Sequence, residues 1–300
     1  EIPMARLTAR DFPPEVMSLV DHYVHGRLDR RGFLEGASRH AGGGMTALAL
    51  LAALSPDFAL AQQVKPDDAR LDARFVEIDS PTGNGKARGY LVRPKGATGK
   101  LPAVLVVHEN RGLNPHIEDV TRRLALENFV AFAPDALFPL GGYPGSEDKA
   151  REAFAKLDQP KTREDFLAAA EWLRGQPGVA EWVGVVGFCY GGSMSNLLAV
   201  RLPWLAAAVP FYGGSQPAAA DAARIKAAVM IHNAEKDDWV SAGAAAYEQA
   251  LQAAGVRFEA FTYPGTLHGF HNDTTPRYDE AAAKLAWQRT LAFFNRQLRG

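Results

Sequence analysis

The chain has 300 residues, 47% of them hydrophobic and 22% charged, which is typical of a globular protein and excludes a disordered or fibrous one. Its 33 Lys and Arg residues almost balance 34 Asp and Glu residues, so no strong field would attract nucleic acid or an anionic membrane surface. The single cysteine, Cys189, excludes an intrachain disulfide and any metal or iron–sulfur site that needs several thiolates.

Residues 1–61 contain the elements of an export signal. The run Arg30-Arg31-Gly32-Phe33-Leu34 is followed by three glycines at 42–44, a short apolar stretch at 45–54 and an Ala-x-Ala step at 59–61. This order is typical of a secretory signal, and the basic pair resembles a twin-arginine signal, which implies export of an already folded protein. We therefore expect cleavage near Gln62 and a periplasmic mature protein without a membrane span.

The alternative for residues 1–61 is a set of amphipathic helices that pack on the domain of a cytoplasmic protein. A long segment precedes the arginine pair, and its residues 14–26 are helix-like. Signal peptides do not need such a segment. Both interpretations stay open from the sequence alone.

Residues 62–300 are expected to form one α/β domain. Strands at 72–78 and 89–93, joined by a turn-rich segment, indicate a hairpin. Strands and helices then alternate, with strands at 103–107, 129–133, 182–186, 206–211, 227–232 and 258–263, and helices near 117–127, 162–174, 192 onward, 241–254 and 278–297. This alternation predicts a mostly parallel, doubly wound sheet with helices on both faces.

The pattern is most distinctive at 185–192, an apolar strand, a Gly-x-Cys-x-Gly turn and a helix start. This arrangement is the nucleophile elbow of an α/β-hydrolase fold, with cysteine in place of serine, and its glycines permit a strained turn with close packing. Cys189 would lie at a helix amino terminus, which favours a thiolate, and the amide of Tyr190 would face a developing oxyanion. The alternative is a small buried thiol behind a glycine-rich turn.

Candidate partners follow Cys189 in the order that α/β-hydrolases use, first an acid and then a histidine. Asp237 and His268 each lie in a loop after an apolar strand. The competitors are Glu235 and Asp238 for the acid and His271 for the base. His268 and His271 have i, i+3 spacing without a helix or further obvious ligands, so we predict no metal site.

With these motifs, residues 72–298 resemble the dienelactone hydrolase family. The resemblance is carried by Gly187-Phe188-Cys189-Tyr190-Gly191-Gly192, the Asp237 loop, Leu267-His268-Gly269-Phe270 and Val107-His108-Glu109-Asn110-Arg111-Gly112. It implies Cys189 as the nucleophile, His268 as the general base and later acid, and Asp237 as the group that orients His268.

The resemblance also implies roles for residues after the strand at 103–107. Glu109 matches the family's glutamate that contacts the resting thiol. A carboxylate near a thiol accepts its proton or raises its pKa, so Glu109 would govern ionisation of the nucleophile. The amide of Asn110 would join that of Tyr190 in the oxyanion hole.

The chain departs from the family where dienelactone would be held. Family enzymes that cleave dienelactone bind its carboxylate with arginines at two places, and here the corresponding segments, 134–139 and 268–272, contain none. Arg111 is a candidate cation from another direction, and Phe138 and Tyr143 are expected to form an apolar wall beside the nucleophile. Neutral substrates are therefore expected.

The sequence thus predicts a cysteine-dependent hydrolase of small esters or lactones that needs no cofactor. The alternatives are phosphotriester hydrolysis in the same site and a non-catalytic redox or ligand-binding protein on the same fold. The sequence does not decide whether the chain forms a homodimer.

Overall fold

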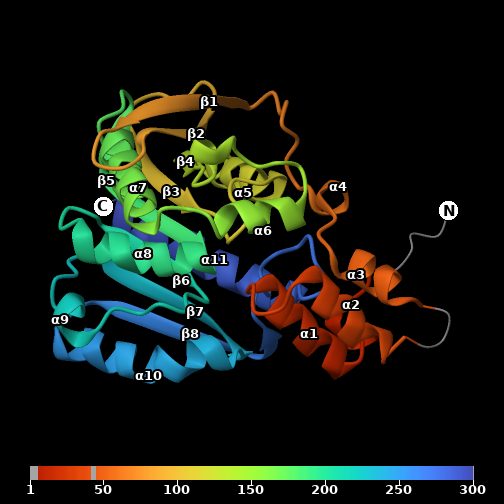
Figure 1. Cartoon of the computed structure of the whole chain (residues 1–300). Coiled ribbons are helices and arrows are strands. Elements are labelled where there is room, and N and C mark those ends of the chain that lie inside the picture. The colour runs from red at the N-terminus through yellow and green to blue at the C-terminus, as the bar shows by residue number, and fades with distance from the viewer. Residues whose placement is uncertain (1–5, 42–44, 300) are drawn as a thin grey trace.

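The protein is described by a computed structural model for residues 6–41 and 45–299. One eight-stranded sheet organises it, in the order β1-β2-β4-β3-β5-β6-β7-β8 (Figure 1). The expected hairpin is present as β1 (Leu71–Ser80) and β2 (Gly85–Pro94), and β2 also pairs antiparallel with β4 (Val130–Pro134). The remaining pairs are parallel and involve β3 (Leu101–Val107), β5 (Val179–Phe188), β6 (Ala207–Phe211), β7 (Ala228–Lys236) and β8 (Phe258–Leu267).

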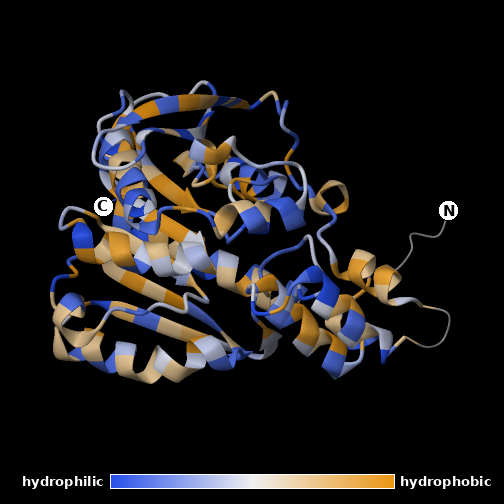
Figure 2. Cartoon of the chain, in the orientation of Figure 1, coloured by the Kyte–Doolittle hydropathy of each residue, from blue (hydrophilic) through white to orange (hydrophobic). Residues whose placement is uncertain are grey.

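Helices cover both faces of this sheet, as the alternating pattern predicted. One face carries α5 (Pro115–Leu126) and α11 (Glu280–Leu298), which share a hydrophobic core with the strands. The opposite face carries α7 (Gln159–Arg174), α8 (Tyr190–Arg201) and α10 (Asp238–Ala253) over a second core. Strands such as β3 are buried on both faces, and Figure 2 shows β3 as a hydrophobic run between the helices. The α/β-hydrolase fold is therefore confirmed.

Three short elements of the sheet domain were not predicted. They are α6 (Glu147–Phe154), the 3₁₀ helix η2 (Phe138–Leu140) and α9 (Ala219–Ala222). Of these, α6 buries only Ala150, so its sequence has little of the apolar periodicity that would reveal a helix. The long strands and helices were found within a few residues of their ends.

The segment expected to carry an export signal forms helices that pack together. The N-terminal helical unit consists of η1 (Ala9–Asp11), α1 (Pro14–Val24), α2 (Arg30–Ser38), α3 (Ala47–Leu54) and α4 (Phe58–Ala61). The basic pair begins α2, in which Phe33 is fully buried, and the apolar stretch forms α3. A separate core, which includes Phe33 and residues of α1 and α3, holds α1, α2 and α3 together, whereas α4 contacts α5. The glycines 42–44 lie outside the described residues.

The N-terminal helical unit is positioned beside the sheet domain, where α1, α2 and α3 lie next to α6 (Figure 1). Leu267, the last residue of β8, packs against the core of this unit, and Arg30 forms an ion pair with Asp148 of α6 at 2.6 Å. These contacts agree with the packed-helix interpretation of residues 1–61. Within the described ranges, no helix combines the length and apolarity that crossing a bilayer requires.

Candidate active site

Cys189 occupies the turn between β5 and α8, where the sequence predicted a nucleophile elbow. Its backbone is left-handed, with φ 57° and ψ −112°, which is strained for a residue with a side chain. A Cβ on Gly187 would lie 1.9 Å from the carbonyl oxygen of Gly191, and one on Gly191 would lie 2.1 Å from the carbonyl oxygen of Val107. Both positions therefore require glycine. The turn presents the thiol beyond the end of β5, at the start of a helix.

His268 and Asp237 meet at the same edge of the sheet, after β8 and β7. Nδ1 of His268 lies 2.6 Å from Oδ2 of Asp237, and both residues are buried. The competing acids are exposed, and Glu235 instead accepts a hydrogen bond from the amide of Gly265. Among the three carboxylates of this loop, the structure therefore pairs Asp237 with the histidine.

The electrostatics of this pair favour an ionised thiol. Burial by itself would raise the pKa of the Cys189 thiol, but the charge of His268 and interactions with His25 lower it to about 6. Burial would lower the pKa of His268, but the Cys189 thiolate and Asp237 raise it to about 10. A thiolate beside an imidazolium is thus the favoured state at neutral pH. Nε2 of His268 is buried, and besides Asp237 the group that interacts with this ring is the Cys189 thiol.

His271, the competing base, lies away from this chemistry. Its ring stacks on Phe188 with a centroid separation of 5.1 Å, and the residue is buried. Burial and the nearby positive charge of Arg123 lower its pKa to about 3, so it stays neutral. Its environment is that of a core histidine.

A second histidine, His25, reaches Cys189 from the N-terminal helical unit. It follows the last residue of α1, and its ring meets that of His268 edge-on with centroids 4.4 Å apart. A ring nitrogen of His25, a ring nitrogen of His268 and Sγ of Cys189 all lie within 4.8 Å of one another. No sequence motif pointed to His25, because only the docking of α1 on the sheet domain brings it to Cys189.

These three side chains carry atoms that a soft metal ion such as Zn²⁺ prefers. They do not by themselves identify a metal centre, because the thiol also stands in a turn with the geometry of a nucleophile elbow. We interpret the cluster as a site of proton transfer and charge stabilisation.

The expected oxyanion hole and Glu109 lie around the same thiol. Tyr190 is the first residue of α8, so its amide has no acceptor within the helix. Glu109 and Asn110 line the cavity above Cys189, and the Glu109 carboxylate accepts a hydrogen bond from Asn272 at 3.0 Å. The Asn110 side chain donates to the carbonyl oxygen of Val24 at the end of α1. The N-terminal helical unit therefore docks directly on the predicted oxyanion loop.

A cavity of about 250 Å³ opens above the thiol. Its apolar wall differs from the one expected, because in the part of the chain that the structure describes its lining includes neither Phe138 nor Tyr143. The wall comes instead from α1 and α3, through Val20, Tyr23, Val24, Leu51 and Leu54. Tyr143 reaches the site indirectly, since its hydroxyl donates to the lining residue Glu147 at 2.8 Å.

The charged groups on the cavity wall are mostly engaged with one another. Arg111, predicted to bind substrate, lines the cavity, but its guanidinium lies 3.7 Å from the Glu147 carboxylate and bonds to backbone and side chain of Asn110. Arg30 pairs with Asp148. Arg277, which sequence analysis missed, also lines the cavity and donates to the carbonyl oxygen of His268 at 3.1 Å. Arg111 and Arg30 thus face carboxylates, whereas Arg277 bonds to a neutral carbonyl oxygen.

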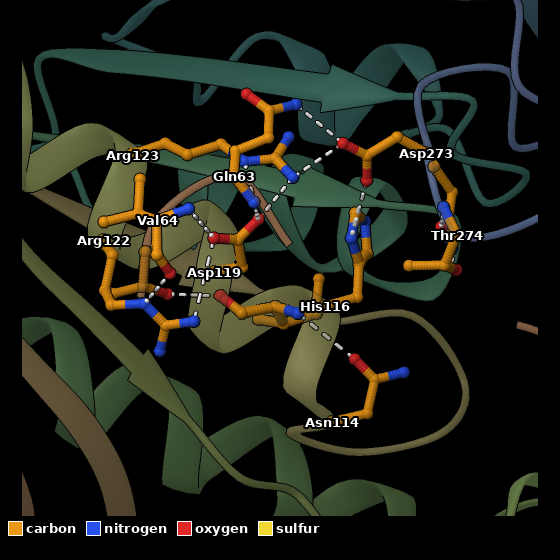
Figure 3. Close-up of polar contacts among 12 residues, drawn as sticks. Gln63, Val64, Asn114, His116, Asp119, Arg122, Arg123, Asp273 and Thr274 are labelled. Carbon is orange, nitrogen blue, oxygen red and sulfur yellow. Dashed lines mark hydrogen bonds and ion pairs between the residues drawn. The ribbon is translucent and has the colours of Figure 1, made fainter. Parts of the chain in front are cut away.

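A buried polar network lies behind the loop that follows His268 (Figure 3). Asp273 accepts hydrogen bonds from Arg123 of α5 and from Gln63 in the segment that follows α4, both at 2.7 Å. Asp119 of α5 accepts from the amides of Gln63 and Val64. This network joins the segment after the N-terminal helical unit, helix α5 and the loop after His268 into one structure.

Comparisons with known proteins divide the chain in a similar way. A model of the dienelactone hydrolase family matches residues 87–298, and a model described as YqhI-like matches residues 4–42. A relative from Salmonella typhi, a putative carboxymethylenebutenolidase, is 34% identical over 76% of this chain and 88% of its own length.

Two solved structures resemble the sheet domain in fold and sequence. A putative dienelactone hydrolase from Klebsiella pneumoniae is 32% identical with a TM-score of 0.66, over 74% of this chain and 98% of that chain. A dienelactone hydrolase-like promiscuous phosphotriesterase from metagenomic libraries is 26% identical with a TM-score of 0.66, over 76% of this chain and 99% of that chain.

Proposed function

Since this chain belongs to the dienelactone hydrolase family, we propose that it is a hydrolase that cleaves small carboxylic esters or lactones through Cys189, His268 and Asp237. The observation that carries the proposal is the 2.6 Å contact between His268 and Asp237 beside a cysteine in a strained elbow. A nucleophile, a base and a group that orients the base are the parts that acyl transfer needs.

The proposed reaction has two stages. The Cys189 thiolate attacks the carbonyl carbon, and the amides of Tyr190 and Asn110 stabilise the oxyanion. His268 donates a proton to the leaving oxygen, which gives an acyl-enzyme, and then accepts a proton from the water that hydrolyses it. Asp237 keeps the ring of His268 in the required tautomer. Glu109, on the cavity wall, is proposed to influence the ionisation of the thiol, because a nearby carboxylate disfavours a second negative charge.

The proposal predicts an acyl adduct on Cys189. We expect mass spectrometry after brief exposure to p-nitrophenyl acetate and related esters to detect one acyl group, on the peptide that contains Cys189. Cys189→Ala should give neither the adduct nor p-nitrophenol release above background. Undiminished release by Cys189→Ala would contradict the proposed nucleophile.

Neutral substrates are expected to react best in this site. The arginines that hold a carboxylate in related enzymes are missing at the expected places, and Arg111 is engaged by Glu147. Each charge-assisted hydrogen bond that is lost costs roughly 1.5–3 kcal/mol, or about one to two decades in kcat/KM. We expect kcat/KM for neutral aryl esters or lactones to exceed kcat/KM for carboxylate-bearing lactones of similar reactivity by that factor. A higher kcat/KM for the carboxylate would identify a cationic clamp, which Arg111→Ala and Arg277→Ala would locate.

Phosphotriester hydrolysis is a second candidate function in the same site. It is favoured by the similarity to the promiscuous phosphotriesterase, which has the same fold and 26% identity. A thiolate beside an oxyanion hole is able to attack a neutral phosphorus centre. Turnover of paraoxon that is lost in Cys189→Ala would support it, whereas peroxide-dependent oxidation of the thiol without any hydrolysis would favour the redox alternative.

For residues 1–61 we propose that the segment is retained in the working protein. Support comes from the buried face of α2, which carries Phe33, and from the ion pair between Arg30 and Asp148. Peptide mapping of the protein from its native host should recover peptides from α1 and α2. Two results together would instead establish twin-arginine export. The periplasmic product would begin near Gln62, and the protein with both Arg30→Lys and Arg31→Lys would stay in the cytoplasm.

A further inference from the structure

Helix α1 ends at the active site, and the residue that follows it points into the catalytic cluster. We propose that His25 is a second catalytic histidine, which stabilises the Cys189 thiolate while His268 exchanges protons with the substrate. This inference rests on the proposed thiolate mechanism and extends it to a residue from outside the sheet domain.

The surroundings of His25 repeat those of His268. Nδ1 of His25 lies 2.7 Å from the carbonyl oxygen of Asp21 and 3.1 Å from its carboxylate, as Nδ1 of His268 lies 2.6 Å from Asp237. Nε2 of each ring is buried and makes no standard hydrogen bond with the described residues. Each imidazole therefore has one nitrogen held by an aspartate residue, and both rings interact with the Cys189 thiol. This is the arrangement of an acid–base group and its orienting partner.

The position of His25 is held by the sheet domain. Asn110 and Arg111 donate to the carbonyl oxygen of Val24, at 2.9 and 3.2 Å, and Arg151 of α6 donates to the carbonyl oxygen of Tyr23 at 3.2 Å. These bonds satisfy carbonyl groups at the end of α1 that lack partners within the helix. Three side chains of the catalytic domain thus fix the turn that carries His25. A helix packed only through apolar contacts would not need them.

The charges around His25 favour its protonated form. Burial would lower its pKa, but Asp21 and Cys189 raise it to about 9, even though the positive charge of His268 opposes this. The charged groups that face it are Asp21 on α1, Cys189 at the elbow and His268 after β8, with Arg277 acting on Asp21. The negative charges of Asp21 and the Cys189 thiolate thus stabilise the positive charge of His25.

Once His268 has given its proton to the leaving oxygen, it no longer carries a charge that stabilises a thiolate. A second imidazolium supplies that charge. The reaction starts with the Cys189 proton already on His268, and the thiolate forms a C–S bond as the carbonyl electrons move to oxygen. His268 protonates the leaving oxygen when the ester C–O bond breaks, and so becomes neutral. In the second stage His268 takes a proton from water and the hydroxide oxygen forms a bond to the acyl carbon. The C–S bond then breaks, its electron pair returns to Sγ, and the acid product leaves. His25 remains protonated throughout and stabilises the departing thiolate.

The test measures thiol ionisation directly, with the full-length protein and EDTA present to remove metal ions. The rate at which iodoacetamide alkylates Cys189 is followed against pH, for wild type and for His25→Gln. Glutamine cannot carry the positive charge, so we expect the midpoint of the alkylation rate against pH, which reports the pKa of the thiol, to rise by roughly one pH unit or more. We also expect kcat/KM for p-nitrophenyl acetate to fall roughly 10- to 100-fold. His22→Gln is the matched control, because His22 lies exposed on the same helix, and it should change neither value.

A second variant covers the case in which His25→Gln does not fold, as judged by thermal unfolding. Asp21→Asn keeps the imidazole of His25 but lowers its pKa, so a smaller fraction of the rings is protonated. The midpoint should therefore move in the same direction by a smaller amount. An unchanged midpoint in the folded variants would overturn the role of His25. A shifted midpoint in a protein that hydrolyses no ester even as wild type would support the role of His25 and refute the proposed function.

Discussion

Replacing His268 with alanine should lower kcat/KM for p-nitrophenyl acetate by three to four orders of magnitude, because one imidazole protonates the leaving oxygen and activates water. Asp237→Asn should reduce turnover by a similar order, since an amide in contact with Nδ1 favours the wrong tautomer of the ring. Initial rates at several substrate concentrations would measure both effects.

The control for this result lies in the same loop. Glu235→Gln and Asp238→Asn change exposed carboxylates near Asp237, and both should retain near wild-type activity. All four variants should unfold at similar temperatures if the loss is chemical. Wild-type activity in Asp237→Asn, with a loss in one of the other two, would transfer the acid role to that residue.

Gly191→Ala should destabilise the protein by about 4 kcal/mol or more. The new Cβ would lie 2.1 Å from the carbonyl oxygen of Val107 and 2.7 Å from that of His108, and backbone atoms of a buried strand end cannot move away cheaply. Urea unfolding followed by circular dichroism would give the change in free energy. We expect the thiol of any folded fraction to be displaced and hydrolysis to be lost.

Gly175→Ala is the matched control for that experiment. Gly175 follows α7, and a Cβ there would meet only the carbonyl oxygens of Trp172 and Glu171, at 3.6 and 3.7 Å. Its free energy of unfolding should stay within roughly 1 kcal/mol of wild type. Equal stability of the two variants would mean that the elbow relaxes more easily than its backbone contacts indicate.

The sheet domain was predictable because its signals are local. Strand β3 is an uninterrupted apolar run, and the turn at 187–191 needs glycines whatever its surroundings. Asp237 and His268 were found because loops after parallel strands meet at one edge of a sheet, so chain order and spacing place them together. Spacing alone left Glu235 and Asp238 as alternatives, and the family resemblance selected Asp237. The structure adds the contact of Asp237 with His268, because burial and the direction of a side chain depend on tertiary packing.

The active-site wall was not predictable for the same reason. Phe138 and Tyr143 are close to the elbow in the expected topology, yet α1 and α3 occupy the space above the thiol. The apolar stretch 45–54 has the composition of a signal core and also of a short buried helix, and periodicity alone does not separate the two. His25 carries no motif, because its role depends on hydrogen bonds to Asp21 and on side chains such as Arg151 that are distant in the chain.

The network behind His268 also bears on the order in which the molecule folds. The segment after α4 bonds to Asp273 through Gln63, and the amide of Asp57 donates to the carbonyl oxygen of Thr274 at 2.8 Å. The N-terminal helical unit leaves the ribosome long before residues 273 and 274, so the segment that follows it finds these partners only after they have emerged. Such distant contacts form late, since closing a long loop costs entropy before its contacts form. During synthesis, the thiol should therefore remain uncovered and open to oxidation until these two distant segments meet.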